Sequence, residues 1–171
     1  KGLANTYKEI AKSYGESFYK GDIAKTISEF IVEQGGFLSV DDLKSYKPEW
    51  IKPVSSNYRG YDVWELPPNG QGIAALQILN ILEQYDIDNM GHNSVEYIHL
   101  FTEAKKLAYE DRAKYYADMN FADVPVEELI SKRYALERNK LINLKKAATS
   151  YSSGIFEDGD TIYMTVADKD G

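Results

Sequence analysis

The spacing of apolar residues predicts two helices in the first part of the chain. The stripe of the first helix follows the i, i+4, i+7 rule and consists of Leu3, Tyr7, Ile10 and Tyr14. Thr6, with Glu9 three residues later, is a candidate capping box for this helix, and Gly15 ends it. Asp22 is the expected N-cap of the second helix, which Gly35-Gly36 ends. The apolar face of the second helix carries Ile23, Ile27, Phe30 and Ile31.

A short capped helix and a pair of strands follow. Ser39, with Asp42 three residues later, predicts a helix that ends before the next proline. Residues 50–58 form an extended run around a proline, which suits an edge strand. After a turn at Arg59-Gly60, residues 61–66 are rich in β-forming side chains and predict a second short strand.

The rest of the hydrophobic pattern predicts three longer helices. Residues 71–85 are apolar on nearly all sides, which is typical of a helix buried in a core. Asn93, with Glu96 three residues later, is the expected N-cap of a helix over about 94–117, and a further helix is expected to end at about Leu144. The stripe of the 94–117 helix consists of Tyr97, Leu100, Phe101, Ala104, Ala108 and Tyr115.

Composition limits the classes of function. The chain has 171 residues, with 20 Lys and Arg against 27 Asp and Glu, so its net charge is −7. This acidic balance argues against a nucleic-acid partner. No apolar run is long enough to span a membrane, and the absence of cysteine excludes disulfides and thiol catalysis but leaves the compartment open. Neither end resembles a natural terminus, so we expect the chain to be part of a longer protein.

Two motifs that could bind a ligand fit structural roles better. The motif Gly70-x-Gly72-x-x-Ala75 is similar to a dinucleotide fingerprint. However, two prolines precede it and no strand ending in an acidic residue follows, so a tight turn is the better interpretation. His92 and His99 lack the spacing of a helical metal pair, and we expect surface or hydrogen-bonded structural roles for both.

Acidic residues on the 94–117 helix are interpreted as part of a solvated face. Glu103, Glu110 and Asp111 lie near basic residues of the same helix, at spacings that are typical of exposed ion pairs. With only 2 histidines, no Ser-His-Asp arrangement is persuasive. The tyrosines on helical stripes are expected to pack in the core and at its rim.

The composition shifts in residues 145–160, where small and polar side chains dominate and predict a flexible linker. The next residues, 161–167, are rich in β-forming side chains, and Asp170-Gly171 is typical of a hairpin turn. One interpretation is a loop before an ordinary strand. The other is a self-cleaving nucleophile, because Thr161 heads the strand directly behind a linker that can move away after cleavage.

A threonine in this position can cut the chain in front of itself and then act as a catalyst. The Thr161 hydroxyl attacks the carbonyl of Asp160 and gives an ester by an N-to-O shift, which water then hydrolyses. The newly formed α-amine has an ordinary pKa of about 7.7–8.0 and can serve as general base for the same hydroxyl. Asp160 and Thr161 are therefore the candidate processing site.

An ordered set of recognisable segments covers nearly the whole chain. The segments are Phe18-Tyr19-Lys20-Gly21, Gly35-Gly36 with Asp42-Leu43-x-x-Tyr46, Tyr58-Arg59-Gly60-Tyr61 ahead of Pro67-Pro68, Leu79-Asn80-Ile81-Leu82, Gly91-His92-Asn93-Ser94, Glu103-Ala104-x-x-x-Ala108-Tyr109-x-Asp111-Arg112, Phe121-Ala122-Asp123-Val124-Pro125, and Thr161 ahead of Val166-Ala167-Asp168-Lys169-Asp170-Gly171. Together these segments resemble the γ-glutamyltranspeptidase family. In such a family the precursor cuts itself into a large and a small subunit, and a threonine heads the small one.

The resemblance implies an α+β fold class, with this chain contributing mostly helices and a few strands to the αββα sandwich of N-terminal nucleophile hydrolases. It implies that residues 1–144 belong to the C-terminal part of the large subunit, residues 145–160 to the linker before the processing site, and residues 161–171 to the start of the small subunit. Thr161 matches the catalytic nucleophile, and Asp160 is the residue before the cut bond. The implied partners are the rest of the precursor and a second copy in an oligomer.

The implied reaction removes a γ-glutamyl group, as from glutathione, through an acyl-Thr161 intermediate that water, an amine or a peptide then accepts. The resemblance implies no metal and no cofactor. Ile162-Tyr163 stands where the transpeptidases usually have Thr-His, and Asn69-Gly70-Gln71-Gly72 stands where they usually have Ser-Ser-Gly-Gly. With these differences the sequence is more similar to the acylase-like branch of the family. A glutaryl or cephalosporin acylase with the same nucleophile, and a catalytically inactive helical interaction module, are the alternatives.

Overall fold

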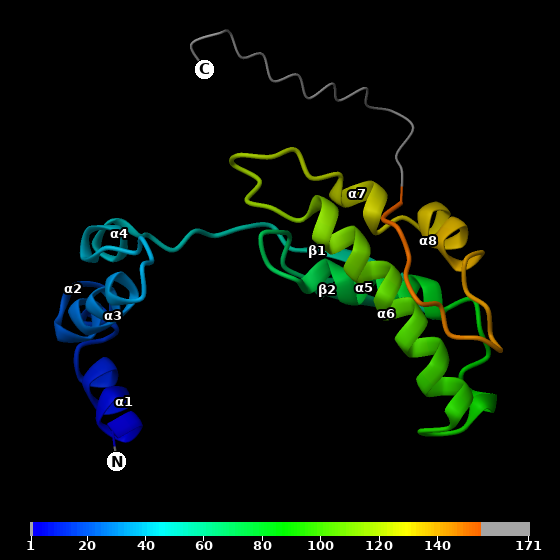
Figure 1. The fold of residues 1–171 in the computed structure, drawn as a ribbon, viewed down its shortest axis with the longest axis horizontal. Coiled ribbons are helices and arrows are strands. Elements are labelled where there is room, and N and C mark those ends of the chain that lie inside the picture. The colour runs from blue at the N-terminus through cyan, green and yellow to red at the C-terminus, as the bar shows by residue number, and fades with distance from the viewer. Residues whose placement is uncertain (1, 155–171) are drawn as a thin grey trace, which may run out of the picture. The chain divides into compact units, whose positions relative to one another are not determined.

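The computed structural model describes residues 2–154, which divide into two compact units between Trp50 and Ile51. Helices dominate both units, and one two-stranded sheet lies in the second (Figure 1). Within residues 2–154, no helix is both long and apolar enough to cross a bilayer. The domain boundaries expected at residues 144 and 160 stay a prediction, and Asp160 and Thr161 lie outside the described residues.

The first unit consists of four helices, α1 (Gly2–Lys12), α2 (Glu16–Lys20), α3 (Asp22–Glu33) and α4 (Val40–Ser45). Two predicted caps are wrong. Thr6 lies inside α1, where its hydroxyl donates to the Gly2 carbonyl at 3.3 Å instead of accepting from a helix N-terminus. Gly21 occupies the N-cap of α3, and Asp22 is the first helical residue, with no side-chain cap.

The core of the first unit is small. Ala24 and Ser28 of α3 are buried, and the Ser28 hydroxyl donates to the Leu38 carbonyl at 3.1 Å. The rings of Tyr19 and Tyr46 stack with centroids 5.7 Å apart and so join α2 to the end of α4. Phe30, predicted on the apolar face of α3, is exposed, because the buried stripe runs through Ala24 and Ser28.

The predicted capping box of α4 is confirmed. The Ser39 hydroxyl accepts from the Asp42 amide at 3.1 Å, and the Asp42 carboxylate accepts from the Ser39 amide at 2.8 Å. The hydrogen bond from the Ser39 side chain, followed by that from its backbone, lowers the pKa of Asp42.

Replacing Ser39 by alanine should therefore open the first turn of α4. An N-cap of this type changes a local opening equilibrium by about a factor of five, so the Asp42 amide should exchange with deuterium about fivefold faster. Hydrogen exchange read by mass spectrometry or NMR checks this result. Ser55→Ala, in the other unit, is the control, and unchanged exchange at Asp42 in Ser39→Ala would contradict the cap.

The second unit packs a hairpin and two short helices around a central pair of helices. Strands β1 (Val54–Tyr58) and β2 (Tyr61–Glu65) are antiparallel, with Val54 opposite Glu65 and Tyr58 opposite Tyr61. The helices are α5 (Gly72–Leu82), the 3₁₀ turn η1 (Asp88–Met90), α6 (Val95–Tyr115), α7 (Val126–Leu129) and α8 (Lys132–Asn139). Helices α5 and α6 lie side by side and form most of the core (Figure 1).

The apolar residues predicted for this core are largely the buried ones. The main cluster consists of Ala74, Ile78, Ile81, Leu82, Leu100, Ala104, Leu107, Ala108 and Ala135. The all-round apolar pattern of residues 71–85 thus correctly predicts a buried helix. A Cβ at position 72 would lie 3.0 Å from the Leu66 carbonyl oxygen and 3.1 Å from the Glu65 Cβ, so Gly72 permits the close approach of the end of β2, in agreement with the tight-turn interpretation.

Two helix boundaries in this unit differ from those predicted. Ser94, rather than Asn93, caps α6, and its hydroxyl accepts from the Tyr97 amide at 3.1 Å. The single helix expected after residue 125 is two helices, because the Ser131 hydroxyl accepts from the Tyr134 amide at 3.1 Å and so starts α8 anew.

Polar side chains fasten the hairpin to the helices. The Asn80 amide group accepts from the Ser56 hydroxyl at 2.6 Å and donates to the Ile130 carbonyl at 2.7 Å. Lys132 donates to the same Asn80 oxygen at 2.7 Å and forms an ion pair with Glu83. The hydrogen bond from Lys132, followed by that from the Arg59 amide, lowers the pKa of Glu83.

Candidate functional site

The chain before the predicted cleavage point is the part of the candidate site that the structure describes. It is described up to Gly154, and six residues, 155–160, separate this glycine from Thr161 in the sequence. Residues 148–154, called here the anchored segment, contain no helix or strand and run beside α6 and α8 (Figure 1). The side chains that hold this segment define the candidate site.

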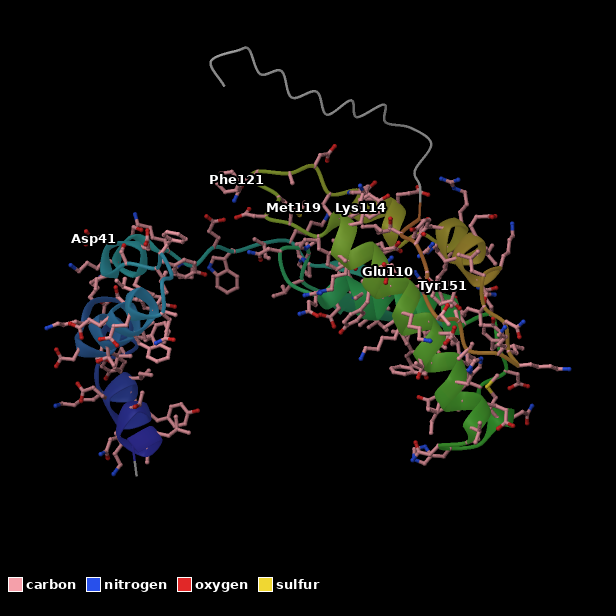
Figure 2. All side chains as sticks on the ribbon, viewed as in Figure 1. Asp41, Glu110, Lys114, Met119, Phe121 and Tyr151 are labelled. Atoms are coloured by element: carbon pink, nitrogen blue, oxygen red, sulfur yellow. The ribbon has the colours of Figure 1, made fainter. Side chains whose placement is uncertain are left out.

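Glu103 of α6 holds the start of the anchored segment. Glu103 is 0% exposed. One carboxylate oxygen accepts from the Ala148 amide at 3.1 Å and from the Tyr151 hydroxyl at 2.5 Å, and the other accepts from Lys106 at 2.6 Å. Lys106 also donates to the Ala148 carbonyl at 2.9 Å, so both backbone groups of Ala148 are bound. Figure 2 shows Tyr151 on the segment beside α6.

Asp111, two turns further along α6, holds the end of the anchored segment. It is 1% exposed. Its Oδ1 accepts from the Gly154 amide at 2.9 Å, and its Oδ2 accepts from the side chain of Gln77 at 2.9 Å. The Tyr115 hydroxyl donates to the Gly154 carbonyl at 2.5 Å. Both backbone groups of Gly154 are therefore bound as well.

Arg138 of α8 holds the anchored segment between its two ends. Its guanidinium lies 3.3 Å from the Asp111 carboxylate, which makes an ion pair buried on both sides. The same Nη2 donates to the Ser152 carbonyl at 2.8 Å and to the Leu107 carbonyl at 3.3 Å. Glu103, Asp111 and Arg138 are together called the anchor cluster below.

The fit around Gly154 is close. A Cβ added at this position would lie 1.8 Å from the hydroxyl and 2.5 Å from Cζ of Tyr134, whose ring is buried. Such distances do not occur between real atoms, so only glycine allows the segment to lie against this ring. The guanidinium of Arg138 lies 5.9 Å from the centroid of the same ring.

The electrostatics of the cluster keep Glu103 ionised and its tyrosine partner protonated. Burial raises the pKa of Glu103, but the hydrogen bonds from Lys106, Tyr151 and the Ala148 amide outweigh this effect and leave the pKa below its ordinary value. Burial, followed by the hydrogen bond to Glu103, raises the pKa of Tyr151. Burial and the nearby charge of Asp111 raise the pKa of Tyr134.

Glu103 should make the stability of the protein depend on acid. Because its folded pKa lies below the ordinary value of 4.5, its stabilisation is present above that pH and is lost as the pH falls through the folded pKa. When thermal unfolding is measured between about pH 5 and pH 3, the midpoint should fall more steeply with decreasing pH for the wild type than for Glu103→Gln. Glu110 is exposed, so Glu110→Gln is the matched control. It should lose stability with falling pH as steeply as the wild type does. Equal slopes in the wild type and Glu103→Gln would contradict the assignment.

The interpretation of Glu103 and Asp111 as solvated residues is wrong, whereas Glu110 is exposed on α6 as expected (Figure 2). The spacing of residues along α6 does indicate that these two carboxylates are buried. Glu103, Leu107 and Asp111 follow i, i+4 spacing, so both carboxylates share a helix face with buried Leu107. A carboxylate on a buried face indicates a bound partner.

Within residues 2–154, the two histidines considered from sequence make contacts of a structural kind. His99 lies 2.8 Å from the Asn143 carbonyl and His92 contacts the neighbouring Asn93, as expected of structural histidines. In residues 2–154, no group of three or more side chains is arranged to hold a metal ion. A groove of about 590 Å³ beside α7 is lined mainly by apolar side chains and contains no histidine.

Comparison with known proteins places these features in a family. The family model described as γ-glutamyltranspeptidase matches residues 1–171. The chain is 42% identical to the glutathione hydrolase-like YwrD proenzyme of Bacillus subtilis, over 100% of this chain and 32% of that protein. The chain therefore spans about a third of the length of this curated relative.

Two solved structures are similar in fold. The cephalosporin acylase of Bacillus halodurans has a TM-score of 0.64 and 46% identity, over 82% of this chain and 26% of that one. The γ-glutamyltranspeptidase of Helicobacter pylori has a TM-score of 0.71 and 34% identity, over 93% of this chain and 47% of that one. These similarities confirm the predicted α+β class within the N-terminal nucleophile hydrolases. The chain belongs to the γ-glutamyltranspeptidase family.

Proposed function

We propose that the chain is part of a self-processing precursor that becomes a γ-glutamyl hydrolase and transferase. The observation that carries this proposal is the family match over the whole chain, which includes Thr161 and the strand-forming residues behind it. The likeness to a protein named as a proenzyme supports a precursor. The rest of this precursor, in large and small subunits, is the proposed partner.

Self-cleavage uses only groups of the chain. The Thr161 Oγ attacks the Asp160 carbonyl carbon and forms a C–O bond, while the C–N bond between the two residues breaks. The hydroxyl proton passes to the departing nitrogen, which becomes the α-amine of Thr161. Water then adds to the ester and releases the Asp160 carboxylate and the Thr161 hydroxyl, so the net change is the hydrolysis of one peptide bond.

Turnover repeats the same chemistry on a substrate. The α-amine of Thr161 accepts the hydroxyl proton as Oγ attacks the γ-glutamyl carbonyl, and it returns the proton to the leaving amine. Water or a second amine then takes the acyl group from Thr161 by the reverse proton path. An α-amine is suited to this role because its ordinary pKa of about 7.7–8.0 lies near neutral pH.

A glutaryl or cephalosporin acylase is the second candidate function. It is favoured by the 46% identity to an enzyme described as a cephalosporin acylase and by Asn69-Gly70-Gln71-Gly72 after the two prolines. The two functions share the nucleophile and differ in the acyl group. A γ-glutamyl group carries an α-amine that a glutaryl group lacks.

The cleaved full-length enzyme, assayed with γ-glutamyl and glutaryl anilides, separates the two functions. A site built to bind the α-amine rejects the analogue without it, so we expect kcat/KM to favour the γ-glutamyl anilide by about a hundredfold or more. A higher kcat/KM for the glutaryl anilide would instead identify the enzyme as an acylase. A fully cleaved protein that is active on neither substrate would contradict both functions and favour an inactive interaction module.

A further inference from the structure

We propose that the anchor cluster is a positioning site for self-cleavage. By holding residues 148–154, Glu103, Asp111 and Arg138 fix the chain shortly before the bond between Asp160 and Thr161. This inference rests on the proposed function, because it assigns these three residues a role in the same cleavage reaction. None of them is placed in contact with the reacting atoms, so their role is positioning and not catalysis.

The type of contact supports a positioning role. A segment without helix or strand would ordinarily expose its backbone to water, yet here side chains bind both backbone groups of Ala148, both of Gly154 and the carbonyl of Ser152. Three buried charged residues of two helices supply three of these five bonds, and Lys106 and Tyr115 supply the other two. Buried ion pairs contribute little net stability compared with apolar packing, whereas they fix geometry strictly.

The close approach at Gly154 fixes the segment in a second way. Its Cα lies against the buried ring of Tyr134, where the smallest side chain would collide with the phenol. The ring therefore blocks any shift of the segment toward α8. Hydrogen bonds to Asp111 and Tyr115 hold the same residue from α6.

Cleavage should depend on this fixation because the Thr161 hydroxyl must face the Asp160 carbonyl, and an anchored upstream chain restricts how that peptide can turn. Holding reacting groups in place accelerates a reaction by removing the entropy of bringing them together. Release of the segment would remove this restraint, so the Thr161 hydroxyl would face the Asp160 carbonyl for a smaller share of the time.

The test measures the first-order rate of self-cleavage in the full-length precursor by intact mass. The double variant Tyr151→Phe/Gly154→Ala removes one hydroxyl bound to Glu103 and forces a methyl group against Tyr134. It should cleave about tenfold more slowly or slower still, because the bond between Asp160 and Thr161 is held less strictly. The matched control is Tyr109→Phe/Gly70→Ala, because Tyr109 lies on the exposed side of α6 and a Cβ at Gly70 meets no atom within 4 Å. The control should cleave at the wild-type rate.

Two further readouts separate positioning from simple structural support. Tyr151→Phe alone keeps its ring and removes one hydrogen bond, so it should slow cleavage in the same direction while lowering the thermal midpoint by only a few degrees. It decides the question if the double variant does not fold. After cleavage is complete, both variants should hydrolyse a γ-glutamyl anilide with the wild-type kcat and KM. A kcat reduced in parallel with the cleavage rate would overturn the inference and leave the cluster a structural one.

The remaining outcomes distinguish this inference from the proposed function. Folded variants that cleave at the wild-type rate would overturn the positioning role and leave the proposed function intact. A wild-type precursor that is never cut between Asp160 and Thr161 would overturn the proposed function and this inference with it.

Discussion

Replacement of Thr161 by alanine in the full-length precursor is expected to abolish both self-cleavage and turnover. Alanine has no oxygen to attack the Asp160 carbonyl, so neither the ester nor the new α-amine can form. The loss should be at least about a thousandfold in each rate, because nucleophile and general base disappear together. Intact mass measures the first rate, and release of the anilide from a γ-glutamyl substrate measures the second.

Thr161→Ser is the matched control for this prediction. Serine keeps the hydroxyl and, once cleaved, the α-amine, so this variant should still cut itself and turn over substrate, although more slowly. A Thr161→Ala precursor that is fully cleaved and active would contradict the assignment of the nucleophile.

Replacement of Asp111 by alanine is expected to destabilise the protein by about 3–5 kcal/mol. The change leaves Arg138 as a buried charge without its ion-pair partner. It also leaves the Gly154 amide and the Gln77 side chain without their acceptor. Urea unfolding of the Thr161→Ala precursor, in which cleavage does not change the sample, measures the loss.

Glu110→Ala, one residue earlier on α6, is the control for this second prediction. Glu110 is exposed, so its removal should change the free energy of unfolding by no more than about 0.5 kcal/mol. Asp111→Asn keeps an acceptor oxygen and should lie between the two. If Asp111→Ala lowered the free energy of unfolding by less than about 1 kcal/mol, the result would contradict the buried ion pair.

Local features of this fold could be predicted from the sequence, and long-range ones could not. The capping box of Ser39 and Asp42 is made within four residues, so its pattern alone predicts it. The buried helix α5 is predicted because apolar residues surround it on nearly all sides. By contrast, Ser94 and Asn93 are both good caps, and only the backbone of the preceding turn decides between them.

The anchor cluster could not be predicted from the sequence for a related reason. Glu103 has Lys106 one turn away, which is the pattern of an exposed pair, but its other partners lie more than forty residues further along the chain. The sequence contains no local sign that residues 148–154 return to α6. The only local signal is the position of Glu103 and Asp111 on the same face as Leu107, where a carboxylate needs a partner.

The measurement that tests the central claim most directly is the intact mass of the full-length precursor after incubation near pH 8. The account predicts two fragments whose masses place the cut between Asp160 and Thr161, with threonine at the N-terminus of the second. A single mass that stays at the value of the uncut precursor, or a cut at another bond, would contradict it.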